Sequence, residues 1–397
     1  MKSKIDTSPE KINNLLSRGV EEVFVAEHLK NALLSGRTLR VKFGIDPTSD
    51  TIHIGRAIVL RKLREFQDLG HTIVLVIGDF TAQIGDPSDK LEKRPMRSES
   101  EVKKNLKRYK TIAGKILDMK KVEFVYNSRW LTKLNFKEVS KLAETFSVQQ
   151  MISRRNFQDR LEKGQEISLR EFLYPIMQGY DSVAVRADVE LGGTDQLFNL
   201  KAGRTIQKFF GLPEQDILMT QMLEGTDGRK MSSSWGNIIA ITDEPSDMYG
   251  KIMALHDNLI VKYFTLCTKL SLEEIASIQK ELANGANPRD SKMRLAREIV
   301  ALYYGDHEAL NAEKNFIETF SRGGVPENIE TIKGDPVNLL GDTLIAAKIL
   351  PSKAQWRRLV LEGAVVNIET NQKVTDPFAA TSAGTYRIGK KTFIRIE

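Results

Sequence analysis

The sequence is poor in cysteine: Cys267 stands alone among 397 residues, which excludes an internal disulfide and every metal site built from several cysteines. The five histidines show no metal-ligand spacing, so we expect no resident metal. No apolar run approaches the ~18–20 residues of a membrane-spanning helix, and the first residues hold no apolar core of a secretory signal. Glycine (27) and proline (12) are too few for a collagen-like or linker-dominated chain. We therefore expect a soluble, cytoplasmic protein without membrane contact.

The residues that are abundant indicate a folded protein with an excess of positive charge. Hydrophobic residues make up 41% and charged residues 28%, and the length suits two or three domains. The net charge is +7, and residues 340–397 hold nine Lys/Arg against five Asp/Glu. Residues 90–110 hold nine more basic residues. A basic patch alone is equally consistent with a solvated surface, but clustering at one terminus favours a polyanionic partner such as nucleic acid.

Strand-like and helix-like segments alternate in the first half of the chain. The strand candidates are residues 38–45, 72–78, 122–126, 183–189 and 217–222, of which 72–78 is a continuous β-branched run typical of a buried parallel strand. The helix candidates between them are residues 56–67, 100–117 and 136–144. This alternation predicts an α/β fold with a doubly wound parallel sheet.

The second half follows a different pattern. Residues 246–320 show helical spacing of apolar side chains with no strand candidate, which predicts a small all-helical domain. Residues 321–335 resemble a linker. A compact α+β unit follows, with a helix at 352–362 and strands near 364–368, 384–388 and 392–396.

The stretch GIDPTSDTIHIGR (residues 44–56) places a turn between a strand and a helix. The N-terminus of a helix at such a junction offers free N–H groups and partial positive charge to a phosphate. Gly55 would let a flat ring approach the backbone, and His53 could donate to phosphate oxygens. Alone, the pattern is also that of an ordinary strand-to-helix turn.

Three further elements carry polar side chains that suit a ligand. The loop 227–234 (DGRKMSSS) combines a lysine with three hydroxyls, which suits a mobile lid over a polyphosphate. An ordinary polar surface loop has the same composition. Tyr174, Gln178 and Asp181 fall on one helix face, where they either satisfy a core network or bind a polar ligand. At 191–196 (LGGTDQ), paired glycines can admit a ligand and Asp195 can bind a ribose.

In order along the chain stand GIDPTSDTIHIGR, IGDPSDK (84–90), YPIMQGYD (174–181), GGTDQ (192–196) and KMSSS (230–234). This ordered set resembles the class I aminoacyl-tRNA synthetases, and among them the bacterial tyrosyl-tRNA synthetases. Residues 352–365 (SKAQWRRLVLEGAV) resemble the small RNA-binding domain, first seen in a ribosomal protein, that closes the bacterial tyrosyl enzymes.

The resemblance implies an activity and an organisation. The family joins L-tyrosine and ATP, with Mg²⁺, into tyrosyl-adenylate and pyrophosphate, then passes tyrosine to the 3′-terminal adenosine of tRNA(Tyr). No covalent enzyme intermediate is needed, so catalysis rests on positioning and on stabilising phosphate charge. We expect a Rossmann-like catalytic domain (1–230), a helical anticodon-binding domain (231–325) and a basic RNA-binding domain (336–397). A helical insertion at about 122–170 would carry the contact of a homodimer.

The resemblance also implies residue roles. The tyrosine site would comprise Asp86, Tyr174 and Gln178 at the ammonium, Asp181 at the phenolic hydroxyl, and Gln196. The ATP site would comprise His53, Gly55 beneath adenine, Gly193, Asp195 at the ribose, Lys230, Ser232 and Ser233. The residues implied at the reacting phosphates are Thr48, His53, Arg56, Lys90, Arg94 and Lys230. The implied RNA-binding residues are Lys353, Arg357 and Arg358.

Four positions depart from the family's patterns. Asp89 replaces a glycine that is usual before Lys90. Arg56 replaces the second histidine of the HIGH motif, and Ser233 replaces the second lysine of KMSKS. Lys42 stands where one branch of the family has a tyrosine near the phenol; VKFGIDPT (41–48) indicates a second branch. Two alternatives stay open: a tryptophan-activating relative, which the helix face at 174–181 and the C-terminal unit disfavour, and a non-catalytic RNA-binding paralogue.

Overall fold

The computed structural model describes residues 5–47, 51–87, 108–232, 235–321, 329–370, 372–389 and 392–397. The chain divides into two compact units, Met1–Asp306 and His307–Glu397. None of the helices in the described ranges has the length and apolar character needed to cross a membrane.

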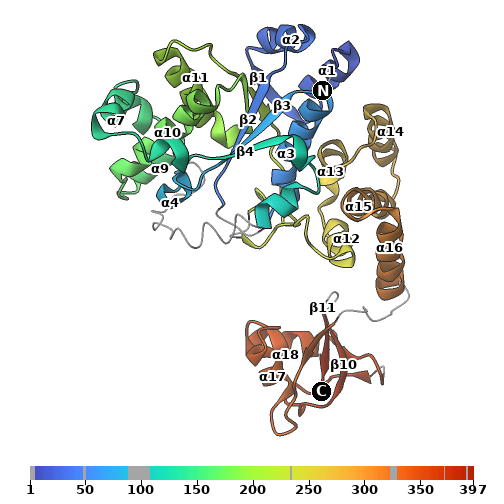
Figure 1. The fold of residues 1–397 in the computed structure, drawn as a ribbon. Coiled ribbons are helices and arrows are strands. Elements are labelled where there is room, and N and C mark those ends of the chain that lie inside the picture. Colours follow the sequence, from blue (N-terminus) through green and yellow to red (C-terminus); the bar gives the residue numbers. More distant parts are fainter. Residues whose placement is uncertain are drawn as a thin grey trace. The chain divides into compact units, whose positions relative to one another are not determined.

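The first unit is built on a six-stranded sheet, shown with its helices in Figure 1. Across the sheet the strands run in the order β1 (Val20–Phe24), β6 (Asp216–Thr220), β5 (Val189–Gly193), β2 (Arg40–Ile45), β3 (Thr72–Ile77) and β4 (Val122–Tyr126). All neighbouring pairs are parallel except the edge strand β1, which pairs antiparallel with β6. The predicted doubly wound sheet is therefore confirmed. In β3 the run Thr-Ile-Val-Leu-Val-Ile is almost wholly buried, as expected of a strand covered on both faces.

Helices cover this sheet on both sides (Figure 1). The N-terminal helices are α1 (Pro9–Ser17), α2 (Ala26–Leu34), α3 (Ile54–Asp68) and α4 (Thr81–Ile84). Between β4 and β5 come α6 (Ser128–Leu131), α7 (Phe136–Ala143), α8 (Val148–Ile152), α9 (Arg155–Glu162) and α10 (Leu169–Val185), and α11 (Leu197–Phe209) follows β5. Short 3₁₀ turns are η1 (Met119–Lys121) and η2 (Thr194–Gln196).

A group of helices follows the sheet in sequence: α12 (Pro245–Met253), η4 (Asp257–Leu259), α13 (Ile260–Cys267), α14 (Leu272–Ala283) and α15 (Pro288–Tyr304). Arg18 and Arg61 donate to the carbonyl oxygens of Leu266, Thr268 and Leu270 at the end of α13. Because these carbonyls have no partner within the helix, the two guanidinium groups cap α13 and fix it to the sheet domain. The predicted helical pattern of this region is confirmed.

The second unit contains α16 (Asp306–Ser321) and a five-stranded sheet in the order β7 (Glu330–Ile332), β11 (Thr392–Ile396), β10 (Gly384–Ile388), β8 (Val365–Asn367) and β9 (Gln372–Lys373). Helices α17 (Leu340–Ala346) and α18 (Lys353–Leu361) pack against it. The core of this unit includes Leu344, Trp356, Val360 and Tyr386, all almost fully buried. The predicted compact α+β unit is confirmed.

Two sequence predictions are wrong in part. Residues 183–185 end α10 and do not form a strand; Arg186 adopts a left-handed backbone that closes the helix, and β5 begins at Val189. From the last helical turn, Val185 packs in one core cluster and Val183 packs against another, so this β-branched pair mimics a buried strand in sequence. The predicted linker contains β7, which pairs parallel with β11; three residues are too short for a periodic signal. Most of the basic run 90–110, and residues 100–107 of the predicted helix 100–117, lie outside the described residues.

Candidate functional site

The order of the strands marks the place where a ligand would bind. β2 is joined to β3 on one side and to β5 on the other, so the strand order reverses between β2 and β5. In open α/β sheets, ligands bind outside the carboxyl ends of the strands at such a reversal. Here those ends carry Asp46 after β2 and the turn Thr194–Gln196 after β5.

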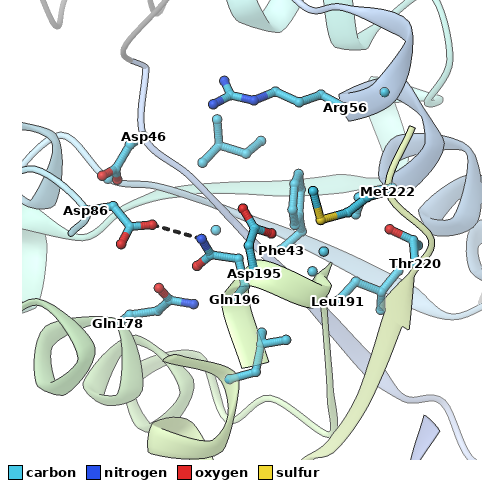
Figure 2. Close-up of a pocket in the computed structure, with 18 of the residues that line it drawn as sticks. Phe43, Asp46, Arg56, Asp86, Gln178, Leu191, Asp195, Gln196, Thr220 and Met222 are labelled. Atoms are coloured by element: carbon cyan, nitrogen blue, oxygen red, sulfur yellow. Dashed lines mark hydrogen bonds between the residues drawn. The ribbon is translucent and has the colours of Figure 1, made fainter. Parts of the chain in front are cut away.

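A pocket lies at this point, and eleven of the predicted site residues line it. They are His53, Gly55, Arg56, Asp86, Tyr174, Gln178, Asp181, Gly193, Asp195, Gln196 and Lys230. Figure 2 shows the carboxylates of Asp46 and Asp86 on one side of the pocket and the Arg56 side chain reaching across it from α3.

The other predicted residues divide into three groups. Ser232 belongs to the loop beside the pocket but does not line it. Lys353, Arg357 and Arg358 lie on α18 in the second unit. Thr48, Lys90, Arg94 and Ser233 lie outside the described residues.

Helix α10 supplies a buried carboxyl group to the pocket. A capping box between Ser168 and Glu171 starts this helix. Asp181, only 3% exposed, accepts hydrogen bonds from Trp130 Nε1 (2.7 Å) and Asn127 Nδ2 (3.3 Å). Burial raises the pKa of Asp181 to about 7, against the lowering effect of the Lys42 charge and of these two donors. The carboxyl group is therefore part of a buried hydrogen-bond network and also lines the pocket.

Lys42 is wholly buried behind this carboxyl group. Its Nζ contacts Glu190 Oε1 at 2.9 Å and donates to Ser182 Oγ (2.8 Å) and the Gln178 carbonyl oxygen (2.9 Å). Glu190 also accepts from Gln178 Nε2 at 3.2 Å. A buried charge needs such partners, and here they connect β2 and β5 to the helix that carries Gln178 and Asp181.

Asp46 forms a second buried acidic group in the pocket. It accepts hydrogen bonds from Tyr174 Oη and Thr81 Oγ1, both at 2.8 Å. Burial raises its pKa to about 6, although these hydrogen bonds act in the opposite direction. A Cβ atom at Gly78 would lie 1.9 Å from Asp46 Oδ1, so a side chain there would displace the carboxylate. The interaction fixes the Tyr174 hydroxyl within the pocket.

Asp86 belongs to a network that extends below the pocket. Its Oδ2 accepts from Gln196 Nε2 at 2.9 Å, a bond drawn in Figure 2. Asn199, which is fully buried, donates to Asp86 Oδ1 (3.4 Å) and Gln196 Oε1 (3.0 Å). Its own oxygen accepts from Arg154 Nη2 at 3.2 Å. The network therefore orients a carboxylate and an amide toward the same space.

The other part of the pocket surrounds the start of α3. His53 is the N-cap residue, and its Nδ1 accepts from the Arg56 backbone N–H at 3.3 Å. A neutral ring with this bond carries its proton on Nε2. A Cβ at Gly55 would lie 3.1 Å from the His53 ring, and one at Gly193 would lie 2.7 Å from Asp195 Oδ1. Both glycines keep the surface open for a ligand.

A buried asparagine holds the loop that carries Lys230. Asn237, 3% exposed, accepts from the Ser232 backbone N–H (2.8 Å) and donates to the Lys230 carbonyl oxygen (3.1 Å) and Asp227 Oδ1 (2.7 Å). The Lys230 ammonium group forms an ion pair of 3.0 Å with Asp195. The loop is thus fixed on both sides of its lysine, and the lysine reaches the end of β5.

Sequence reasoning missed several lining residues, among them Phe43, Tyr109, Leu191, Thr220 and Met222. Burial raises the pKa of Tyr109 to about 12. Thr220 is the last residue of β6 and Met222 follows it, so a strand-end rule would have found them. Tyr109 lacks such a signal, because only tertiary packing brings its helix to the pocket.

Within the described ranges, no group of three or more His, Cys, Asp or Glu side chains is placed to hold a metal ion.

Comparisons with known proteins identify the family. The family described as tRNA synthetases class I (W and Y) matches residues 34–321. A tyrosine–tRNA ligase of Carboxydothermus hydrogenoformans is 44% identical, covering 96% of each chain, and one of Thermotoga maritima is 42% identical, covering 98% of each.

Solved structures agree on the fold. The C-terminally truncated mitochondrial tyrosyl-tRNA synthetase of Aspergillus nidulans superimposes with a TM-score of 0.64 at 22% identity, covering 78% of this chain and 94% of that one. The tyrosyl-tRNA synthetase of Archaeoglobus fulgidus, solved with L-tyrosine, gives 0.63 at 22% identity, covering 78% and 100%. Given the family match over most of the chain and relatives more than 40% identical across nearly all of it, this protein belongs to the class I tRNA synthetases of the tryptophan and tyrosine group.

Proposed function

We propose that this protein is a tyrosine–tRNA ligase. The observation that carries the proposal is Asp181, a buried hydrogen-bond acceptor in the same pocket as the start of α3 and Lys230. A phenolic hydroxyl group can donate to this carboxylate, whereas an unsubstituted phenyl ring offers no donor there. Relatives 42–44% identical over nearly the whole chain bear the name tyrosine–tRNA ligase, which supports the same substrate.

The amino-acid side of the pocket suits tyrosine at both ends. The phenol would donate to Asp181, whose carboxylate Trp130 and Asn127 hold in place. The ammonium group would lie near Asp86, the Tyr174 hydroxyl and Gln178. Gln196, which is bonded to Asp86, would lie beside the amino acid. These roles rest on the position of each residue in the pocket and on the family's motifs.

The nucleotide side suits ATP. The reaction joins a tyrosine carboxylate oxygen to the α-phosphorus and releases pyrophosphate; a ribose hydroxyl of tRNA then attacks the tyrosyl carbonyl and releases AMP. His53, with its ring proton on Nε2, and Arg56 would donate to phosphate oxygens as charge develops. Thr48, Lys90 and Arg94 would act at the same phosphates. Adenine would pack on Gly55, with Gly193 beside it.

Lys230 links the two parts of the nucleotide site. It now pairs with Asp195, the residue that we assign to the ribose. Binding of ATP would offer Lys230 a phosphate and Asp195 a hydroxyl in exchange. Ser232 and Ser233 would complete this loop over the phosphates. Magnesium would enter with ATP, because Mg²⁺ commonly binds through substrate phosphates and a few carboxylates and retains several waters.

The C-terminal unit would bind tRNA(Tyr) through Lys353, Arg357 and Arg358, which are all exposed on α18. The division into a catalytic domain (1–230), a helical anticodon-binding domain (231–325) and an RNA-binding domain (336–397) stays a prediction. Charging of tRNA for protein synthesis would place the protein in the cytoplasm.

We also propose a homodimer whose contact lies in the segment between β4 and β5. Large apolar side chains are exposed along this segment: Phe136 (88%), Val148 (59%), Leu161 (49%) and Leu169 (79%). Isolated exposed apolar residues are normal, but several within one segment favour a protein contact. Sedimentation at micromolar concentration should give a dimer, and a monodisperse monomer would contradict this part of the proposal.

The deciding experiment is amino-acid-dependent ATP–pyrophosphate exchange with magnesium. Exchange with tyrosine, and not with tryptophan or phenylalanine, is expected. Exchange that depends on tryptophan would instead show that the protein is a tryptophan-activating member of the family. If folded protein catalyses no exchange, Arg56→His becomes informative, because a large gain from near zero would indicate a decayed catalytic site.

A further inference from the structure

An aromatic ring in the second unit is held rigidly at the surface. Phe378 is 62% exposed, but the backbone around it is fixed. Its N–H donates to Asp376 Oδ1 at 2.8 Å, and the buried Trp356 donates from Nε1 to the Pro377 carbonyl oxygen at 2.8 Å. On the other side, the Ala379 carbonyl oxygen accepts from the Leu340 N–H at 2.9 Å. Because residues 376–379 are already ordered in the free protein, a partner that binds there loses little affinity to the entropy of ordering this turn.

A positively charged side chain lies beside the exposed ring. The Arg357 guanidinium group lies 5.6 Å from the centroid of Phe378, and Lys353 and Arg358 lie on the same helix. Lys353 pairs with Asp342 at 2.8 Å, and Arg358 approaches Glu362 at 3.8 Å. Among the described residues, Arg357 forms no ion pair with an acidic side chain, and its guanidinium group contacts the Phe378 ring. Its charge is thus available to an anion at the edge of the ring.

An exposed ring next to a cation suits an unpaired nucleotide better than a protein surface. A base can stack on the ring while the adjoining phosphate meets the guanidinium group. A protein contact of useful strength would need a contiguous apolar area, and the α18 side chain that contacts Phe378 is the cationic Arg357.

We propose that Phe378 and Arg357 form a stacking site for one unpaired base of the bound tRNA. The proposal rests on the proposed function, because it takes tRNA as the ligand of the second unit. Phe378 would thereby recognise an unpaired base, in addition to the phosphate contacts made by α18.

The test compares full-length variants in tRNA(Tyr) binding at several salt concentrations. Phe378→Ala should weaken binding about 5- to 100-fold, the range for loss of one stacked base, whereas Phe378→Trp should retain it. Phe378→Ala should leave the salt dependence unchanged, because stacking releases no counterions. Arg357→Ala should reduce the slope of log K against log [salt] by about one. Leu361→Ala, which removes another exposed apolar side chain (80%) from the same helix, is the matched control and should bind normally.

Tyrosine-dependent pyrophosphate exchange is measured on the same preparations and should be equal in all of them. If exchange is normal and Phe378→Ala binds tRNA within twofold of the unchanged protein, the stacking site is wrong while the proposed function stands. Equal loss in Phe378→Ala and Leu361→Ala would likewise overturn it, as would a change in oligomeric state caused by Phe378→Ala. Absence of exchange in the unchanged protein would reject the proposed function instead.

Discussion

At the scale of single residues, the pocket depends on carboxyl groups that burial makes hard to ionise. Asp46 and Asp181 both have a raised pKa, at about 6 and about 7, because burial outweighs their hydrogen-bond donors and nearby positive charge. Between about pH 4 and the pKa of the folded state, each carboxyl group is ionised in the unfolded chain but protonated in the native protein. These groups therefore oppose folding increasingly as the pH rises through that window.

Asp181 should give tyrosine activation a measurable pH dependence. The ionised carboxylate is the better phenol acceptor, so kcat/KM for tyrosine should fall by up to about tenfold per unit as the pH drops below 7. Asp181→Asn should flatten this limb and reduce the preference for tyrosine over phenylalanine by about 10- to 100-fold. Pyrophosphate exchange from pH 5.5 to 8.5 measures both. In Asp181→Asn, a fall of kcat/KM below pH 6 should remain, because Asp46 still titrates there. If this variant keeps its preference for tyrosine over phenylalanine, our assignment of the phenol site is refuted.

Asn199 makes no direct contact with the pocket, yet it orients two groups that do. Asn199→Ala should raise the KM for tyrosine about tenfold, because Asp86 and Gln196 each lose a buried hydrogen bond. The kcat of exchange should change less, since we assign the phosphates to another part of the pocket. Asn199→Asp keeps the acceptor for Arg154 but loses both donations and adds a charge beside Asp86, so its KM should rise further. Thr205→Ala, at an exposed position of α11, is the control; equal effects of all three substitutions would indicate general destabilisation.

The sequence allowed much of this site to be predicted, but not its supporting layer. Residues such as Asp86 and Asp195 stand in short motifs at strand ends or turns, where local order determines position. Asn199 lies on α11, Trp130 on α6 and Arg154 just before α9. Only the packing of these elements reveals that the three residues support Asp86 or Asp181. The sequence around Lys42 indicates a branch of the family. Its ion pair with Glu190 could not be predicted, because it depends on the pairing of β2 with β5.

At the scale of elements, the position of α10 depends on close contact with α11. A Cβ at Gly179 would lie 2.8 Å from Ile206 Cδ1 and 2.9 Å from the Ala202 carbonyl oxygen. The backbone oxygen cannot rotate away as a side chain does, so any larger residue must separate the helices. Because Gln178 and Asp181 flank this contact, a shift of α10 reaches the tyrosine site directly.

Gly179→Ala should therefore destabilise the protein by about 1–3 kcal/mol, the usual cost of overpacking, and raise the KM for tyrosine. Gly250→Ala is a matched control within α12, where nothing lies within 4 Å of the new Cβ. That substitution should stabilise by about 0.5–1 kcal/mol through helix propensity alone. Chemical denaturation measures both changes. Equal stability of the two variants would show that α10 and α11 are not in the close contact described.

Element prediction succeeded where one period ran unbroken and failed where helix and strand signals coincide. The strand 72–77 and the helix 54–68 have clear patterns, and both formed. Residues 183–185 did not follow the strand pattern, because the last turn of α10 buries Val185 fully and Val183 partly. The three-residue strand β7 gained its identity only from pairing with β11, 62 residues later.

At the scale of the whole molecule, the pocket and the basic helix α18 lie in different compact units. Each unit has its own core: Trp356, Val360 and Tyr386 lie in the second, and β3 with α3 lie in the first. Amino-acid activation needs only the pocket, whereas transfer also needs tRNA. The two steps should therefore respond separately to substitutions in the two units.

Arg357→Gln/Arg358→Gln tests this separation in the full chain. Because two exposed cations are lost, tRNA affinity should fall and the slope of log K against log [salt] should shrink by about two. Tyrosine-dependent pyrophosphate exchange should remain within twofold, since neither residue lines the pocket. Asp181→Asn is the reciprocal control and should impair exchange while leaving tRNA binding intact. Loss of both activities in the double variant, with folding preserved by circular dichroism, would mean that tRNA binding and activation share one surface.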